Sequence, residues 1–270
     1  MIQKIYNSIR LNLGIKKFLH NLMRKLQYLV DTFFFLTIYR FLDKYIANRI
    51  FSYYGADYRW GKMKPQNLDK STGNLGYGLF HKAIIRNARP KRILCIGSMY
   101  GFIPYMLANA CEENGQGHVD FVDAGYDASD KDDASRHMFG QGFWKRISPT
   151  SHFKYLLRGK YVSTYVMTSG EFAKKYKFKY DYVYIDGDHS YEGAIKDIRL
   201  FWPRLKKDGF ICLHDIHLKK TYGKVKIEYW KAWRDLSPMP FKFELSNHFS
   251  GLGFIQKIGN SPLPKKITRH

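Results

Sequence analysis

The feature that most limits the fold of this chain is the run YDYVYIDGDHSYEGAIKDIRLFWPRLKKDGFICLHDI, residues 180–216. The aromatic and β-branched segment Tyr182 to Ile185 predicts one strand, and Phe210 to Leu213 predicts another. Between them lie a loop, a helix beginning near Tyr191 and the turn Asp208-Gly209. Two strands joined by a helix predict neighbouring parallel strands of an α/β sheet.

Carboxylates and imidazoles follow both of these strands. Asp186, Asp188 and His189 come after the first strand, and His214 and Asp215 come after the second. Because parallel strands place their carboxyl ends on one edge of an open sheet, where ligands bind, we expect the two groups to lie side by side. Such donors can hold a divalent metal and supply a base.

Further elements are expected on both sides of this run. The sequence predicts strands over Arg92 to Ile96, Val119 to Val122 and Tyr161 to Met167, helices over Leu79 to Arg86, Phe102 to Ala110 and Trp230 to Leu236, and a closing antiparallel pair, Phe241 to Leu245 with Gly253 to Ile258. The long, poorly periodic stretch Asp127 to Gly159 is typical of a lid or substrate loop. In that stretch, Phe143 and Trp144 are expected to pack in the core rather than stack on a sugar.

Composition divides the chain into three parts. Residues 1–55 hold nine Lys or Arg and only two acids, and their apolar residues follow a helical stripe, which predicts a basic amphipathic helical arm. The arm suits an anionic membrane surface, or equally the surface of its own domain or of a second subunit in a homo-oligomer. Residues 56–260 form the α/β domain, and residues 261–270 a basic tail. The apolar stretch from Leu26 to Tyr39 is too short to span a bilayer, which takes about 20 residues.

The formal net charge of +22 favours an anionic partner, although a bias of genome composition explains it equally well. The three cysteines, Cys95, Cys111 and Cys212, show no CxxC spacing and are expected to be buried, reduced thiols. Together with the lack of a signal-peptide pattern, they predict a cytoplasmic protein, peripheral at the inner membrane face if the arm binds lipid.

A glycine turn follows the strand that ends at Ile96. Gly97 to Gly101 (GSMYG) leads into a helix, and Asp123 follows the next strand. This order suits a nucleotide-type cofactor, because glycine lets the backbone approach the ligand and an acid can accept hydrogen bonds from ribose hydroxyls. The spacing is not that of GxGxxG, so this turn by itself is a weak signal.

Taken together, these motifs resemble the class I S-adenosylmethionine-dependent methyltransferases, and more narrowly the branch of macrocin O-methyltransferase and related sugar O-methyltransferases. The resemblance covers roughly residues 75–258 and rests on RILCIGSMYGFIPYMLA, FVDAG, TSGEF, YDYVYIDGDHSYEGAIKDI, LKKDGFICLHDI and GLGFIQK. It implies a Rossmann-like α/β fold with a seven-stranded, mostly parallel sheet whose last strand is antiparallel.

The resemblance also implies roles for individual residues. Those expected to bind the cofactor S-adenosylmethionine are Gly97, Ser98 and Gly101 (methionine part), Asp123 (ribose), Ser169 and Glu171 (adenine), and Asp186. Asp186 and Asp215 match the acids that hold a divalent metal, expected here to be Mg²⁺ or Mn²⁺, in metal-dependent members, and His189 matches the base. His214 is only a candidate third ligand, because it departs from the family pattern, so weak binding, a different metal and no metal all stay open. Two residues depart from the pattern: Cys95 replaces an acid before the first glycine, and His214 stands where relatives often have an acid.

The sequence thus predicts an enzyme that moves a methyl group to a hydroxyl of a sugar, a glycan, or a nucleotide- or lipid-linked sugar. Instead of a catalytic role, His189 could have a purely structural one as a hydrogen-bonded residue, and Asp188 could simply be the N-cap of the following helix.

Two other functions stay open. One is a nucleic-acid methyltransferase, which the charge favours and the absence of an NPPY-like or DPPY-like motif disfavours. The other is a membrane-associated relative that has lost activity, which Cys95 suggests.

Overall fold

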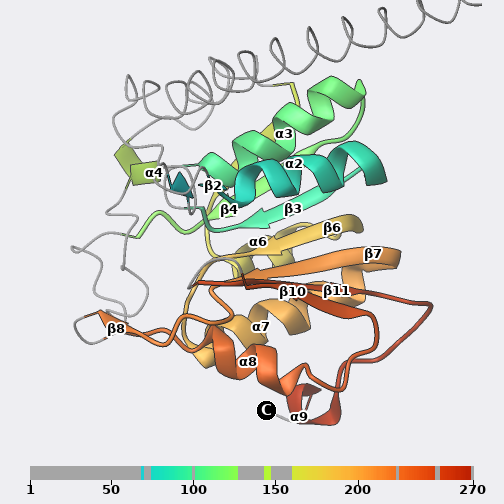
Figure 1. Cartoon of the computed structure of the whole chain (residues 1–270). Coiled ribbons are helices and arrows are strands. Elements are labelled where there is room, and N and C mark those ends of the chain that lie inside the picture. The colour runs from blue at the N-terminus through green and yellow to red at the C-terminus, as the bar shows by residue number, and fades with distance from the viewer. Residues whose placement is uncertain are drawn as a thin grey trace, which may run out of the picture. The chain divides into compact units, whose positions relative to one another are not determined.

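Figure 1 shows a computed structural model of the chain, whose described residues all belong to one unit, Asp57–His270. The structure describes residues 68–69, 74–98, 101–126, 143–146, 160–222, 225–246 and 250–268. The predicted arm and most of the predicted lid lie outside these residues, so both stay predictions.

The centre of the domain is a seven-stranded sheet in the order β10-β11-β7-β6-β3-β4-β5. Its strands are β3 (Ile93–Ile96), β4 (Val119–Asp123), β5 (Val162–Val166), β6 (Tyr180–Ile185), β7 (Leu205–His214), β10 (Lys242–Leu245) and β11 (Leu252–Gln256). The five strands β7, β6, β3, β4 and β5, which are adjacent in that order, all pair in parallel. β11 is antiparallel to both of its neighbours, β7 and β10. The fold class predicted for the sheet is therefore confirmed.

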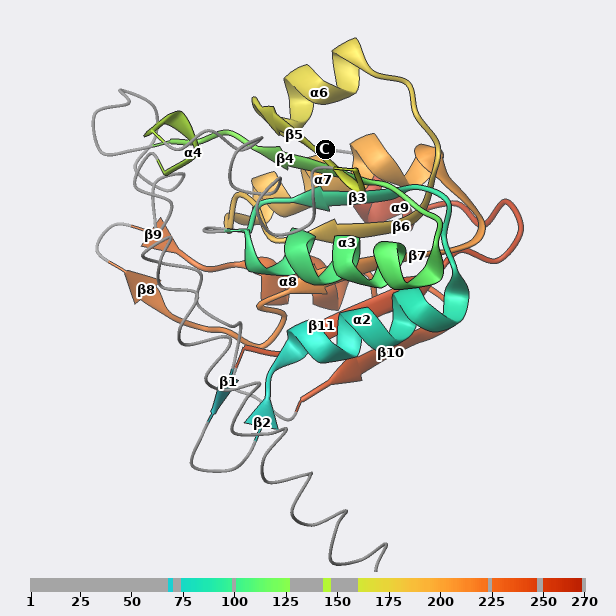
Figure 2. The same ribbon diagram turned by 90° about the horizontal axis from the view of Figure 1, so that it is seen from above.

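Helices cover both faces of this sheet (Figures 1 and 2). On one face lie α2 (Tyr77–Ala88) and α3 (Phe102–Asn114), and on the other α6 (Ser169–Lys175), α7 (Tyr191–Phe201) and α8 (Tyr229–Asp235). The shorter elements are α4 (Phe143–Arg146), α9 (Lys265–Thr268), the 3-10 helix η3 (Trp202–Arg204), and two antiparallel pairs, β1 (Leu68–Asp69) with β2 (Asn74–Leu75) and β8 (Thr221–Tyr222) with β9 (Val225–Lys226). None of the described helices combines the length and apolar character needed to cross a bilayer.

The core follows the alternation of the strands. Val183 and Ile185 of β6 pack with buried residues of α6, α7 and α8, as do Ile211 and Leu213 of β7. All three cysteines are buried and unpaired, as predicted. Trp144 is buried with its ring edge-on to Phe121, at a centroid distance of 4.9 Å, so it packs in the core as expected.

One local prediction is wrong. Asp208 and Gly209 do not form a plain turn before the second strand, because β7 begins at Leu205 and includes both residues. The pairing of β6 with β7 shifts register between Tyr180 and Tyr182, and Asp208 has a φ of 63°. The dipeptide therefore forms an irregularity inside the strand, since Asp tolerates the left-handed region better than most residues.

Candidate active site

The register of the parallel strands brings the predicted site residues to one level of the sheet edge. Ile96 pairs with both Val122 and Ile185, and Ile185 pairs with Leu213. The next residue on each strand is therefore at the same height, which places Gly97, Asp123, Asp186 and His214 along one edge. The expectation that the two acidic strand ends lie side by side is confirmed.

The loop after β6 is fixed by its own hydrogen bonds. Ser190, not Asp188, is the N-cap of α7, and its hydroxyl accepts a hydrogen bond from the Gly193 N–H at 3.0 Å. The proposed cap, Asp188, instead accepts from the Ser190 N–H at 3.0 Å, in an Asx turn. Gly193 is required there, because a Cβ would lie 2.4 Å from the Asp188 side chain. The loop therefore holds His189 in a defined position.

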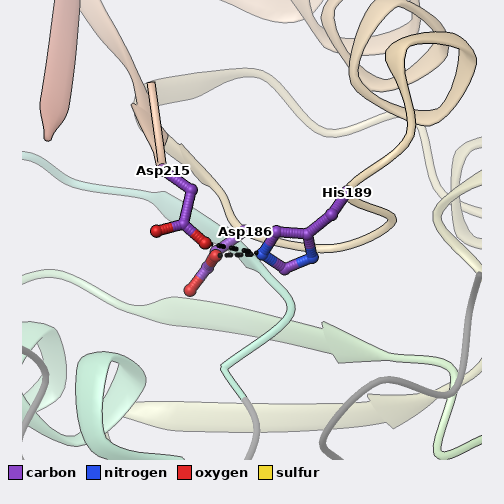
Figure 3. Close-up of side chains that lie close together, drawn as sticks. All are labelled: Asp186, His189 and Asp215. Carbon is purple, nitrogen blue, oxygen red and sulfur yellow. Dashed lines mark hydrogen bonds and ion pairs between the residues drawn. The ribbon is translucent and has the colours of Figure 1, made fainter. Parts of the chain in front are cut away.

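Asp186, His189 and Asp215 converge at this edge (Figure 3). His189 Nε2 lies 2.9 Å from Asp215 Oδ2 and 3.4 Å from Asp186 Oδ1. His214 joins them, with its Nδ1 3.1 Å from Asp186 Oδ1 and 3.3 Å from Asp215 Oδ1. All four side chains are largely buried. Asp215 follows β7 with a φ of 58°, a conformation that commonly marks functional positions in residues other than glycine.

The charges of these four groups depend on one another. Burial opposes a charged ring at His189, but its hydrogen bonds to Asp186 and Asp215 outweigh burial and raise its pKa to about 10. Burial likewise opposes the charge of Asp186, yet His214 and His189 hold its pKa well below the usual range. Burial opposes a charge on His214 as well, and Asp215 and Asp186 nevertheless raise its pKa. The protonated His189 ring thus offsets part of the negative charge of the two carboxylates.

Aromatic residues that the sequence analysis did not select support this cluster. Tyr184 donates a hydrogen bond to Asp186 Oδ2 at 3.0 Å. Tyr184 precedes Asp186 by two residues, and residues two apart in a strand point to the same face, so the sequence alone could have indicated this contact. Tyr229 stacks on His189 at a centroid distance of 5.1 Å and accepts a hydrogen bond from the Gly187 N–H. No local pattern links Tyr229 to His189, because 40 residues separate them in the chain.

The predicted cofactor turn adjoins this cluster. Gly97 has a φ of 70°, and a Cβ there would lie only 2.1 Å from the carbonyl oxygen of Asp186. The missing side chain therefore lets the ends of β3 and β6 approach each other. Gly101 has a φ of 88°, and the Ser98 hydroxyl accepts a hydrogen bond from the Ile103 N–H, which places Ser98 at the start of α3.

Asp123 lies at the tip of β4, where the sequence places a ribose-binding acid. Its Oδ1 accepts a hydrogen bond from the Gly125 N–H at 2.8 Å. Burial raises the pKa of Asp123 to about 6, although backbone N–H groups of Gly125 and Ser98 oppose the rise. The predicted roles of Gly97, Ser98 and Gly101 at the methionine part of S-adenosylmethionine, and of Asp123 at its ribose, stay predictions.

The predicted adenine-side residues are engaged within the protein. Glu171 closes a capping box with Thr168 at the start of α6, and Ser169 donates a hydrogen bond to the buried Asp197. The loop follows the carboxyl end of β5, so it lies at the same edge of the sheet as the other predicted site residues. The adenine roles of Ser169 and Glu171 stay predictions.

Asp197 provides a test of the electrostatics behind the site. Burial raises its pKa to about 7, against the opposing effects of Ser169 and Lys196. A carboxyl whose pKa is higher in the folded state than in the unfolded state binds more protons when folded, so stability falls as pH rises from about 4 to about 7. Asp197→Asn should therefore raise the free energy of unfolding at pH 8 by about 3 kcal/mol.

This gain from Asp197→Asn should shrink steadily below pH 7 and disappear near pH 4, as urea unfolding at several pH values would show. The matched control is Asp181→Asn, which removes a half-exposed carboxylate that pairs with Lys206. That change should cost stability at pH 8 rather than add it. A gain of equal size at every pH would mean that Asp197 is not protonated on folding.

The residues present suit a divalent cation. One donor atom from each of Asp186, His189 and Asp215 lies within 4.8 Å of the others. The His214 Nδ1 also lies close to both carboxylates, so it can be the imidazole donor if His189 acts as the base. Carboxylate oxygens suit Mg²⁺ or Mn²⁺, and imidazole nitrogens suit Mn²⁺, Fe²⁺ or Zn²⁺, so a mixed set favours Mn²⁺ over Mg²⁺. The buried thiol of Cys95 replaces an expected acid, and its Sγ lies 3.5 Å from the Gly97 carbonyl oxygen.

Comparison with known proteins agrees with this geometry. Residues 94–216 match the family model described as methyltransferase domain. This region runs from β3 through the two acidic strand ends. No curated protein sequence matches the chain.

Solved structures show the same fold at low sequence identity. TomG, an O-methyltransferase from Streptomyces achromogenes involved in tomaymycin synthesis and solved with SAM, is 12% identical, with a TM-score of 0.54 over 78% of this chain and 90% of TomG. The cofactor-bound protein Rv0187 from MTB is 13% identical, with a TM-score of 0.54 over 78% of this chain and 91% of that protein. A Klebsiella pneumoniae protein with a provisional O-methyltransferase assignment is 13% identical, with a TM-score of 0.53 over 79% of this chain and 90% of its own. Residues 94–216 of this chain therefore match a methyltransferase domain, and the solved structures share the fold that the resemblance to class I S-adenosylmethionine-dependent methyltransferases implies.

Proposed function

We propose that this protein is an O-methyltransferase that moves a methyl group from S-adenosylmethionine to a hydroxyl of a sugar or glycan. The observation that carries the proposal is the convergence of Asp186 and Asp215 with His189, beside the glycine turn at Gly97. The printed description of TomG as an O-methyltransferase in complex with SAM supports the hydroxyl as acceptor and SAM as donor. The sugar is favoured by the motifs shared with the macrocin branch.

Methyl transfer needs alignment more than activation of the donor. The methyl group of a sulfonium is displaced in line, so the enzyme must hold the acceptor oxygen behind it. Asp123 and the turn at Gly97 would hold the donor, and the cluster on the neighbouring strands β6 and β7 would hold the acceptor. Because the register places both at one edge, a single ligand-binding surface can serve them.

Asp186 and Asp215 are the proposed metal ligands, with His214 as a third. A divalent cation bound there would act as a Lewis acid that lowers the pKa of the acceptor hydroxyl. Its charge would also replace the charge that the His189 ring supplies to the two carboxylates. Metal binding near neutral pH should accordingly release protons from the site.

His189 is the proposed base. While its Nε2 bridges Asp186 and Asp215, its raised pKa keeps it protonated and unable to accept a proton. Once the two carboxylates are neutralised by another cation, the interactions that raise this pKa weaken, and the ring can accept the hydroxyl proton. Stacking on Tyr229 keeps the ring in place in either state.

His189→Ala tests this assignment. We expect S-adenosylhomocysteine to bind with unchanged affinity in calorimetry, because His189 lies outside the proposed cofactor contacts. Turnover, measured as transfer of a labelled methyl group to a panel of glycans and sugar nucleotides, should fall by about 10²–10⁴-fold. His118→Ala is the matched control, since His118 is also part-buried and hydrogen-bonded, to Ser163, at the opposite end of β4 and β5.

Three results would contradict the proposal. Wild-type turnover in His189→Ala would remove His189 as the base. No detectable binding of S-adenosylhomocysteine to the wild-type protein would instead favour the inactive relative. A steep salt dependence with nanomolar affinity for RNA would favour the nucleic-acid methyltransferase.

A further inference from the structure

The segment from His217 to Arg234, which we name the basic segment, is attached to the candidate active site at both ends. It begins two residues after Asp215. Near its other end, the Glu228 N–H donates a hydrogen bond to the His189 carbonyl oxygen at 2.8 Å, and Tyr229 stacks on the His189 ring. Figures 1 and 2 show its hairpin, β8 with β9, projecting at the end of the sheet where α4 also lies. The segment therefore flanks the place where the acceptor must bind.

The basic segment carries a strong excess of positive charge. Between His217 and Arg234 the sequence has six lysines or arginines and one acid, Glu228. Glu228 forms an ion pair with Lys231, and Asp235, the residue directly after the segment, lies 3.8 Å from Arg234 Nε. Lys219 and Lys226 are exposed and make no ion pair with any residue that the structure describes. The surface beside His189 is therefore cationic and only partly neutralised.

Three of these cations gather around one indole ring. Lys219 Nζ lies 5.0 Å from the centre of a Trp230 ring, Lys231 Nζ lies 5.7 Å away, and Arg234 Cζ lies 5.5 Å away. Each distance permits a cation–π attraction, which offsets part of the repulsion between the like charges. An anion bound among them would remove that repulsion and gain charge-assisted hydrogen bonds.

We propose that the basic segment binds a phosphate or pyrophosphate group of the acceptor. The inference rests on the proposed function and makes it more specific: the acceptor is a phosphorylated carbohydrate. Lys219, Lys226 and Arg234 hold the phosphate while the hydroxyl to be methylated reaches His189. A small acceptor fits better than a long polyanion, because both ends of the basic segment are fixed beside the site and the sugar must enter it.

Titration of inorganic pyrophosphate into the full chain tests the inference. The double variant Lys219→Gln with Lys226→Gln should raise the dissociation constant about tenfold, the size expected when two solvent-exposed ionic contacts are lost. The control, Lys91→Gln with Lys207→Gln, removes the same charge from exposed lysines before β3 and at the start of β7, at the opposite edge of the sheet. It should change the constant by less than about twofold.

The outcomes separate the inference from the proposed function. An equal loss in both double variants, or no binding of pyrophosphate to the wild type, overturns the anion site. S-adenosylhomocysteine should bind all three proteins equally, and failure to bind the wild type overturns the methyltransferase function whatever pyrophosphate does. A third arm uses phosphatidylcholine vesicles with and without phosphatidylglycerol. If the lysine pair is needed for vesicles and not for pyrophosphate, the segment serves a lipid surface and the inference fails.

Discussion

Asp215→Asn should lower turnover about 1000-fold and make the remaining activity insensitive to chelators. Asp215 supplies one of the two carboxylates that meet His189, and its Oδ2 lies 2.9 Å from the ring. The amide keeps the size of the side chain, and Asn tolerates the left-handed backbone that Asp215 adopts, so the fold should survive. Methyl-transfer rates with and without added Mn²⁺, together with S-adenosylhomocysteine calorimetry, would check this.

Asp208→Asn is a closely matched control. Asp208 lies in β7, the strand that Asp215 follows, and also has a positive φ, but it is exposed and accepts no hydrogen bond from the described residues of the site. Both substitutions remove one negative charge, and both place Asn in a left-handed backbone conformation. Only Asp215 is a ligand of the proposed metal. Equal, full activity in both variants would exclude a metal bound by Asp215.

Gly97→Ala should lower the free energy of unfolding by about 4 kcal/mol or more, the range reserved for severe steric conflicts. The added Cβ would lie 2.1 Å from the Asp186 carbonyl oxygen and 2.6 Å from its carbonyl carbon. Both atoms belong to the backbone, so the ends of β3 and β6 would have to separate. Urea unfolding would measure the loss, and calorimetry should show that S-adenosylhomocysteine binding is lost with it.

Gly115→Ala isolates the backbone contribution. Gly115 has a φ of 67°, close to that of Gly97, but a Cβ there meets nothing within 4 Å. The cost should therefore be only the left-handed strain, about 1 kcal/mol. If both variants lose the same stability, the close approach of Gly97 to Asp186 is not what fixes the strand ends.

The sheet and the acidic edge were predictable because their signals are local. Residues 182–185 show the composition of a buried strand, and acids follow directly. Once two strands are parallel neighbours, their ends must meet, so Asp186 and Asp215 could be paired without any structure. The closing antiparallel pair could also be predicted from the sequence, since β10 and β11 are short strands close together in the chain.

The remaining details depend on contacts that sequence patterns do not record. Asp188 and Ser190 are both good N-cap residues, and the choice between them is decided by which one the α7 backbone reaches. The stacking of Tyr229 on His189 requires α8 to pack beside the loop after β6. The protonation of His189 follows from two carboxylates that belong to different strands, so it emerges only when their geometry is known.

The position of β11 has a consequence for the biosynthesis of this protein. β11 is synthesised after both β7 and β10, yet it lies between them and pairs with the strand that ends at His214. Leu252 is opposite His214, and the Ser250 hydroxyl lies 3.4 Å from His214 Nε2. While the chain is still on the ribosome, β7 has an open edge and His214 lacks these partners. This edge of the site is thus completed only after residues 250–256 have been made, so a nascent chain that ends before β11 lacks it.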